Sequence, residues 1–178
     1  MFGLSTQMAM NPGLEKRLYP QLVKAYKQEL SKSAPKLYMD KSHPNIWLAE
    51  KLKASFPRAL FIGIERNPYA TVASMMKHKG VTAWHSRWRE FPVPNRFLGI
   101  SATEAEGYEN IPIASQCAMR WLAHHSRMSR LENILGVNTS TAMPDSSLES
   151  LHKRESQLSN EEIEQIKKIV GFSPDTIK

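Results

Sequence analysis

Three polar residues around a predicted strand-to-helix turn have the types and spacing to bind a phosphate. Arg66 follows the apolar run 60–64, Asn67 begins a predicted helix, and Ser74 lies two turns further along it. An arginine guanidinium offers a planar fork of donors that suits phosphate oxygens. The start of a helix adds unpaired N–H groups and the positive end of the helix dipole. The spacing therefore predicts a phosphate site in which Arg66 and Ser74 are the binding side chains.

A purely structural role for the same side chains also explains the pattern. Arg66 can form an ion pair with a carboxylate, and Glu65 and Asp40 are the candidates. Ser74 is then an ordinary surface hydroxyl. The spacing alone leaves both interpretations open.

The elements that must position Arg66 read as strands alternating with helices. Segments 36–39 and 60–64 are strand candidates, whereas 44–55 and 68–79 have helical spacing. The continuous apolar run 60–64 is typical of a strand buried on both faces of a parallel sheet. Open α/β sheets bind ligands beyond the carboxyl ends of their strands, which is where Arg66 is expected.

Further helices are predicted over 14–33, 114–135 and 159–170, and irregular segments over 81–112 and 136–157. The fold class is therefore α/β, with a parallel sheet flanked by helices. Only two strands are evident, and a two-stranded sheet is marginal on its own. We therefore expect an incomplete sheet.

Residues 38–80 resemble the sulfotransferase family. The run Arg66-Asn67-Pro68, followed by Ser74, is similar to the family motif that binds the 3′-phosphate of PAPS (3′-phosphoadenosine 5′-phosphosulfate). The run Asp-Lys-Ser-His-Pro at 40–44 is similar to two variants of a second motif. One variant is an acidic residue, Lys, Ser or Thr, and Pro; the other is Lys-Thr-His, in which the histidine is the catalytic base.

The resemblance implies a P-loop-NTPase-like fold and a single domain over residues 1–178. It implies transfer of a sulfuryl group from PAPS to an acceptor hydroxyl or amine, with PAP (3′,5′-adenosine bisphosphate) as the product and no metal. The acceptor is then a small molecule or a glycan, and residues 81–112 are expected to shape its pocket.

The resemblance also implies a role for each site residue. His43 is the general base, and Asp40 is its rival for that role. Lys41 neutralises the charge that develops on the bridging oxygen. Arg66 and Ser74 bind the 3′-phosphate of the cofactor.

Two departures from the family pattern stand out. Gly3 and Gly13 are isolated, and no glycine-containing loop for the 5′-phosphosulfate is present in the sequence. The family also has a strand after the helix that corresponds to 114–135, where this chain passes to a polar tail. We therefore expect a truncated sulfotransferase: a fragment, the product of a misassigned gene or a natural degenerate copy. The alternative function is that of a catalytically inactive remnant that binds PAP or a partner.

The charge distribution favours an anionic partner. The 178 residues include 24 Lys and Arg and 17 Asp and Glu, a net charge of +7. Residues 1–100 carry 16 basic and six acidic side chains, a net of +10, and residues 101–178 carry eight and 11, a net of −3. A phosphate-bearing or sulfated small molecule suits the basic half. Nucleic acid is a less favoured partner. It would bind to basic residues that are interleaved with Trp84 and Trp88.

The remaining sequence features bear on disulfides, metal binding, membrane insertion and oligomer formation. Cys117 is the one cysteine, so no intramolecular disulfide can form, and its place on an apolar helix face predicts burial. Adjacent histidines 124 and 125 point about 100° apart on a helix, which argues against a shared metal. The apolar runs are too short to span a bilayer and no secretory leader is visible, so we expect a cytoplasmic protein. Exposed sheet edges would allow oligomers to form.

Overall fold

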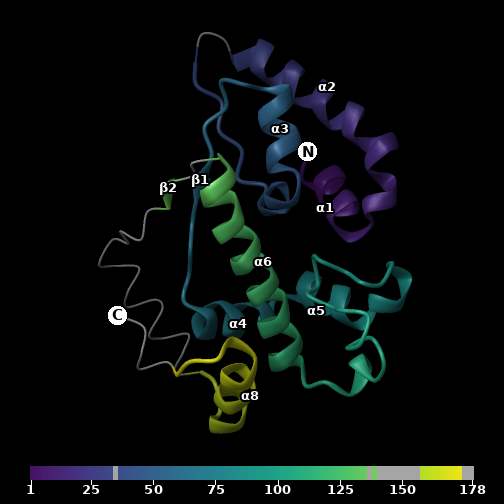
Figure 1. The fold of residues 1–178 in the computed structure, drawn as a ribbon, viewed down its shortest axis with the longest axis vertical. Coiled ribbons are helices and arrows are strands. Elements are labelled where there is room, and N and C mark those ends of the chain that lie inside the picture. Colours follow the sequence, from purple (N-terminus) through teal and green to yellow (C-terminus); the bar gives the residue numbers. More distant parts are fainter. Residues whose placement is uncertain (34–35, 136–137, 140–156, 174–178) are drawn as a thin grey trace. The chain divides into compact units, whose positions relative to one another are not determined.

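A computed structural model describes residues 1–33, 36–135, 138–139 and 157–173 (Figure 1). The chain divides into two compact units, Met1–Phe61 and Ile62–Lys178. Each unit has a hydrophobic cluster of its own. The expectation of a single domain over the whole chain stays a prediction.

Unit 1 is helical. It contains α1 (Phe2–Met10), η1 (Pro12–Leu14), α2 (Glu15–Ser33), η2 (His43–Trp47) and α3 (Ala49–Ser55). The predicted helix over 14–33 is confirmed by α2, whose apolar stripe recurs every four residues. This stripe forms a cluster with one residue of α1 and with the α3 region, made of Met8, Leu18, Leu22, Tyr26, Leu48 and Leu52.

Two expectations for unit 1 are wrong. Segment 36–39 is not a strand, and two of its apolar side chains are exposed, Leu37 by 89% and Met39 by 71%. No other described segment pairs with it, and a strand needs a partner for its backbone groups. The helix expected over 44–55 is also interrupted, because Leu48 has non-helical dihedrals (φ −117°, ψ 4°) between η2 and α3.

Unit 2 is built around one long helix. Its elements are β1 (Ile62–Gly63), α4 (Pro68–Lys77), α5 (Lys79–Ser86), η3 (Trp88–Glu90), η4 (Tyr108–Asn110), α6 (Ile113–Leu135), β2 (Asn138–Thr139) and α8 (Asn160–Val170). Figure 1 shows α4 and α8 against the same half of α6. The cluster between these helices includes Tyr69 and Val72 of α4, Trp121 of α6, and Ile166 and Val170 of α8.

The described sheet is limited to two strands of two residues each. Strands β1 and β2 pair in parallel, with Ile62 opposite Asn138 and Gly63 opposite Thr139. The described part of the chain is otherwise mostly helical, so the parallel sheet flanked by helices is not confirmed. Because β2 follows shortly after α6, the expectation that no strand comes after this helix is wrong.

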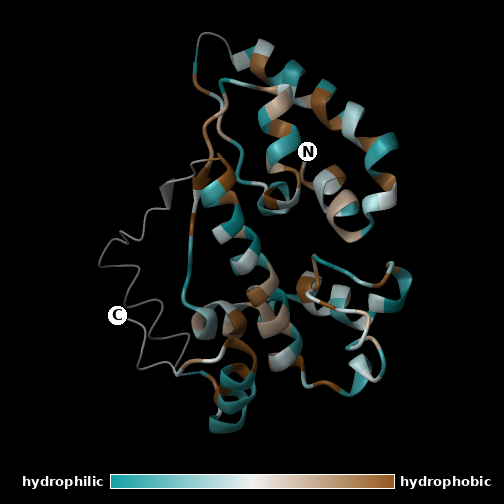
Figure 2. Ribbon diagram, in the orientation of Figure 1, coloured by the Kyte–Doolittle hydropathy of each residue, from teal (hydrophilic) through white to brown (hydrophobic). Residues whose placement is uncertain are grey.

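The expected burial of the 60–64 run is also wrong. Leu60 is 90% exposed, Ile62 74% and Ile64 67%, and Figure 2 colours this segment as hydrophobic. A strand is buried on both faces only where helices cover both sides of its sheet. A two-residue pair does not create that environment, so apolar sequence did not lead to burial here.

Segment 81–112 contains more regular structure than expected. It includes most of α5, with η3 and η4, and residues Asn95 and Ile100 exchange backbone hydrogen bonds of 2.8 and 3.0 Å. Four of its large apolar side chains are buried: Trp88, Phe97, Leu98 and Tyr108. Most of the segment 136–157, predicted to be irregular, lies outside the described residues.

The last predicted helix is confirmed by α8, with the ends that the sequence indicates. Ser159 and Glu162 form a capping box, and Gly171 ends the helix in the left-handed region at φ 86°. No helix in the described ranges is both long and apolar enough to cross a membrane.

Candidate functional site

The side chain of Arg66 is exposed in the turn between β1 and α4. Within the described residues its guanidinium makes no hydrogen bond or ion pair. The structural interpretation offered Glu65 as its partner, but Glu65 Oε1 lies 2.7 Å from Nδ1 of His125 on α6. The guanidinium of Arg66 can therefore accept an anionic ligand without first breaking an ion pair within this part of the chain.

The start of α4 offers fewer backbone donors than a typical helix N-terminus. Asn67 is the N-cap, as predicted, and its Oδ1 accepts a hydrogen bond of 3.1 Å from the N–H of Ala70. Pro68, the first residue of the helix, has no N–H. Any anion bound here depends mainly on side chains, with the helix dipole as a secondary contribution.

Ser74 lies on the solvent-exposed side of α4, two turns after the cap. The opposite side of α4 buries Tyr69, Val72 and Ala73. Packing of the apolar face therefore fixes the side of α4 on which Ser74 lies.

Two residues of α6 that sequence reasoning did not link to the turn support it. The Trp121 indole N–H donates to the carbonyl oxygen of Arg66 at 3.1 Å. The same ring stacks on His125, with centroids 4.8 Å apart and planes 9° from parallel. Contacts between residues 55 or more positions apart leave no local signal, so the sequence could not reveal them.

The loop that carries the second motif is fastened through Asp40. One carboxylate oxygen accepts from the N–H and the hydroxyl of Ser42, at 3.0 and 2.8 Å. The other accepts from the Tyr26 hydroxyl and, at 2.9 Å, from the Asn45 amide. Ser5 of α1 donates in turn to Asn45 at 2.6 Å. Asp40 thus joins α1, α2 and η2.

The electrostatics of Asp40 suit this anchoring role. Burial alone would raise the pKa of its carboxyl, but hydrogen bonds from Tyr26, Ser42 and Asn45 outweigh burial and lower it. Burial and the bond to Asp40 in turn raise the pKa of the Tyr26 phenol far above its usual value. A carboxylate with a lowered pKa and both oxygens engaged is a weak proton acceptor.

Lys41 and His43 are exposed in the same loop. His43 begins η2, and its ring lies 5.4 Å from the ring of Phe2, centroid to centroid. Ser42 occupies the N-cap position of η2. Both side chains can therefore reach solvent and a bound molecule.

The predicted site residues fall into two groups, one in each unit. Asp40, Lys41 and His43 belong to unit 1, and Arg66 and Ser74 belong to unit 2. A shallow depression of about 780 Å³ lies along α2 in unit 1, but none of the five site residues lines it.

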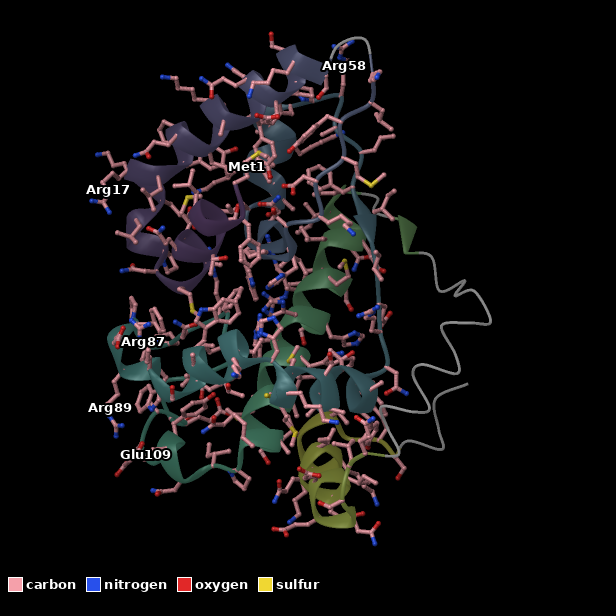
Figure 3. The ribbon with its side chains drawn as sticks, turned by 180° about the vertical axis from the view of Figure 1, so that it is seen from behind. Met1, Arg17, Arg58, Arg87, Arg89 and Glu109 are labelled. Atoms are coloured by element: carbon pink, nitrogen blue, oxygen red, sulfur yellow. The ribbon has the colours of Figure 1, made fainter. Side chains whose placement is uncertain are left out.

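The aromatic side chains that suggested nucleic-acid binding are engaged inside unit 2. The Trp84 ring packs edge-on against Phe97, and the Trp88 ring against Tyr108, each at 5.4 Å. Arg89 pairs with Glu109 at 2.6 Å (Figure 3). The two tryptophans are therefore poorly placed to stack on bases, which weakens the nucleic-acid alternative.

The cysteine and the two adjacent histidines are packed against other groups of the protein. Cys117 is fully buried in the α4–α6–α8 cluster, and burial raises the pKa of its thiol to about 12. His124 Nε2 lies 3.1 Å from the carbonyl oxygen of Phe97, whereas His125 faces Glu65. Within the described ranges, no group of three or more His, Cys, Asp or Glu residues is placed to hold a metal ion.

Comparison with known protein families assigns the chain to one of them. Residues 6–130, more than half of the chain, match the sulfotransferase family and include all five site residues. The chain belongs to the sulfotransferase family. No curated protein and no solved structure matches it. The resemblance of residues 38–80 to this family is therefore confirmed, and the match extends over part of α1, all of α2 and most of α6.

Proposed function

We propose that this sulfotransferase-family chain binds a 3′-phosphoadenosine nucleotide through Arg66 and Ser74. It then transfers a sulfuryl group from PAPS to the hydroxyl or amine of a small-molecule acceptor. The observation that carries the proposal is the state of Arg66, an exposed guanidinium without an ion-pair partner among the described residues. Membership of the family supplies the class of reaction.

The side chains at the turn fit the 3′-phosphate of such a nucleotide. The guanidinium of Arg66 can donate two parallel hydrogen bonds to phosphate oxygens, and the Ser74 hydroxyl can donate a third. Asn67 already caps the helix, so the charge-assisted bonds from Arg66 contribute most of the affinity. When bound, PAPS supplies an activated sulfuryl group.

His43 is the proposed general base. Its exposed imidazole can accept the proton of the acceptor hydroxyl or amine at a ring nitrogen. The ammonium of Lys41, two residues earlier, stabilises negative charge on the departing oxygen. Asp40 suits the role of base less well, because its oxygens already accept four hydrogen bonds and its pKa is lowered. We therefore propose that Asp40 positions the loop.

Calorimetric titration of PAP into the purified chain tests the binding proposal. Arg66→Ala should weaken PAP binding roughly ten- to hundredfold, and Ser74→Ala less, since a bond to a charged group contributes more than a neutral one. AMP, which lacks the 3′-phosphate, is the matched ligand and should bind equally to wild type and Arg66→Ala. Arg130→Ala, which removes an exposed cation from α6, should leave PAP affinity unchanged. Equal PAP affinity of wild type and Arg66→Ala would refute the proposed site.

Formation of PAP from PAPS, with phenol and primary-amine acceptors, tests the catalytic proposal. His43→Gln should lower the rate roughly a hundredfold or more, as for loss of a general base. PAP affinity should be unchanged in this variant, because the 3′-phosphate is bound elsewhere. Retention of full activity by His43→Gln would contradict the assignment of the base.

One observation favours the inactive-remnant alternative enough to keep it. The two groups of site residues lie in different compact units, so unit 2 could bind PAP without support from the loop of unit 1. PAP binding that depends on Arg66, together with no PAPS turnover, would identify the chain as a binding module.

A further inference from the structure

We infer that Trp121 and His125 are positioning residues that present Arg66 to the 3′-phosphate and keep the neighbouring carboxylate away from it. This inference rests on the proposed function and extends it from the ligand-binding side chains to the helix behind them. It depends on the stacked pair formed by one face of α6 and on the two contacts that this pair makes with the turn.

The backbone contact fixes the position of Arg66 on its carboxyl side. The Trp121 Nε1 hydrogen bond of 3.1 Å holds the carbonyl that links Arg66 to Asn67. Asn67 in turn caps α4, so this peptide is held by α6 and by α4 together. The Trp121 side chain is itself 7% exposed, packed in the core of unit 2 and edge-on to the ring of Phe172. The anchor is therefore rigid.

The side-chain contact acts on the amino side of Arg66. Glu65 is the residue immediately before Arg66, and an unrestrained carboxylate there could pair with the guanidinium or repel a phosphate. His125 Nδ1, at 2.7 Å from Glu65 Oε1, holds this carboxylate. The imidazole is kept in place by stacking on Trp121, one turn earlier on α6.

The two contacts together restrict the turn but leave the Arg66 side chain exposed. Binding of a ligand at this restrained turn costs less conformational entropy than binding at a turn that must first become ordered. Mobility of the guanidinium is then limited to its own rotamers. Loss of either contact should weaken the binding of an anion without removing any atom that touches it.

Titration of PAP into double-mutant combinations tests the backbone contact. Trp121→Phe removes the N–H and should weaken PAP binding roughly three- to tenfold, the effect of a lost neutral hydrogen bond. In an Arg66→Ala background the same substitution should have no further effect, because it acts through Arg66. Equal weakening in both backgrounds would show a general structural role and overturn the inference.

The pair His125 and Glu65 supplies a second test that does not endanger the core, since both side chains are 35–41% exposed. His125→Ala should weaken PAP binding several-fold, and Glu65→Gln in the same chain should restore it, because the unrestrained charge is then gone. Arg130→Ala is the control for general loss of positive charge on α6. Failure of Glu65→Gln to restore binding overturns the role of His125.

The outcomes separate this inference from the proposed function. No PAP binding by the folded wild-type chain removes both. PAP binding that is lost in Arg66→Ala but unchanged in Trp121→Phe and in His125→Ala removes the inference and leaves the proposed site intact. Weakening that depends on Arg66, with rescue by Glu65→Gln, supports both.

Discussion

Nδ1 of His85 lies 2.7 Å from the phenol oxygen of Tyr108, and the two buried side chains share a hydrogen bond inside unit 2. Burial and the nearby charge of Arg120 lower the pKa of His85 to about 4. Nε2 is also buried, with no hydrogen-bond partner among the described residues. A protonated imidazole carries an N–H at both nitrogens, and Nε2 has no acceptor among the described residues, so the folded chain favours the neutral ring.

This histidine predicts a loss of stability in mild acid. Folding lowers its pKa from 6.5 to about 4. The contribution of the neutral ring to the free energy of unfolding is therefore complete above pH 6.5 and is lost as the pH falls toward 4. The loss should reach on the order of 3 kcal/mol. Urea unfolding at pH 7 and pH 4.5 measures it. His85→Asn, which keeps a polar group near the Nδ1 position, should show a smaller difference between the two pH values; an identical difference would contradict the assignment.

Asp40 should behave as an anchor of its loop. Asp40→Asn keeps the size of the side chain but removes the charge that Ser42 and Tyr26 stabilise, and it should lower the free energy of unfolding by about 1–2 kcal/mol. Because the pKa of Asp40 is lowered on folding, its contribution is present above pH 3.8 and is lost as the pH falls through the lower pKa of the folded state. Thermal unfolding of Asp40→Asn and Tyr26→Phe should show similar losses. An Asp40→Asn chain of unchanged stability that lacks sulfuryl transfer would restore Asp40 as the base.

Cys117 should be unreactive in the folded chain. Burial raises the pKa of its thiol to about 12, and the thiolate is the reactive form. Labelling with a disulfide reagent at about pH 8 should be slow without denaturant. It should be fast in about 6 M guanidinium, which unfolds most domains. Rapid labelling of the native protein would show that the thiol is accessible.

Gly99 should tolerate no side chain. It has a positive φ of 75°, and a Cβ there would lie 2.3 Å from the carbonyl oxygen of Met119 on α6. Gly99→Ala should destabilise the chain by about 1–3 kcal/mol more than Gly107→Ala. Gly107 is the matched control, because its φ is 82° but the nearest atom to a Cβ is 3.8 Å away. Equal unfolding free energies of the two variants would show that the strain of a positive φ, and not the contact with α6, limits the residue at Gly99.

Local signals in the sequence determined several of the helices and the family to which the chain belongs. The four-residue stripe of α2, the Asn67 cap of α4 and the capping box of α8 each depend on residues within one or two turns, and the structure confirms them. The motif around Arg66 and Ser74 also lies within nine residues, which is why the family could be recognised from it.

Tertiary structure alone decided which side chains are held and which are available. The partner of Glu65 is 60 residues away on α6, and the donor to the Arg66 carbonyl is 55 residues away. The apolar run 60–64 is another case in which the local sequence did not determine burial. Hydrophobic residues are buried only where other elements cover them, and those elements come from other parts of the chain. Pairing and burial depend on contacts far apart in the chain, so no local pattern could determine them.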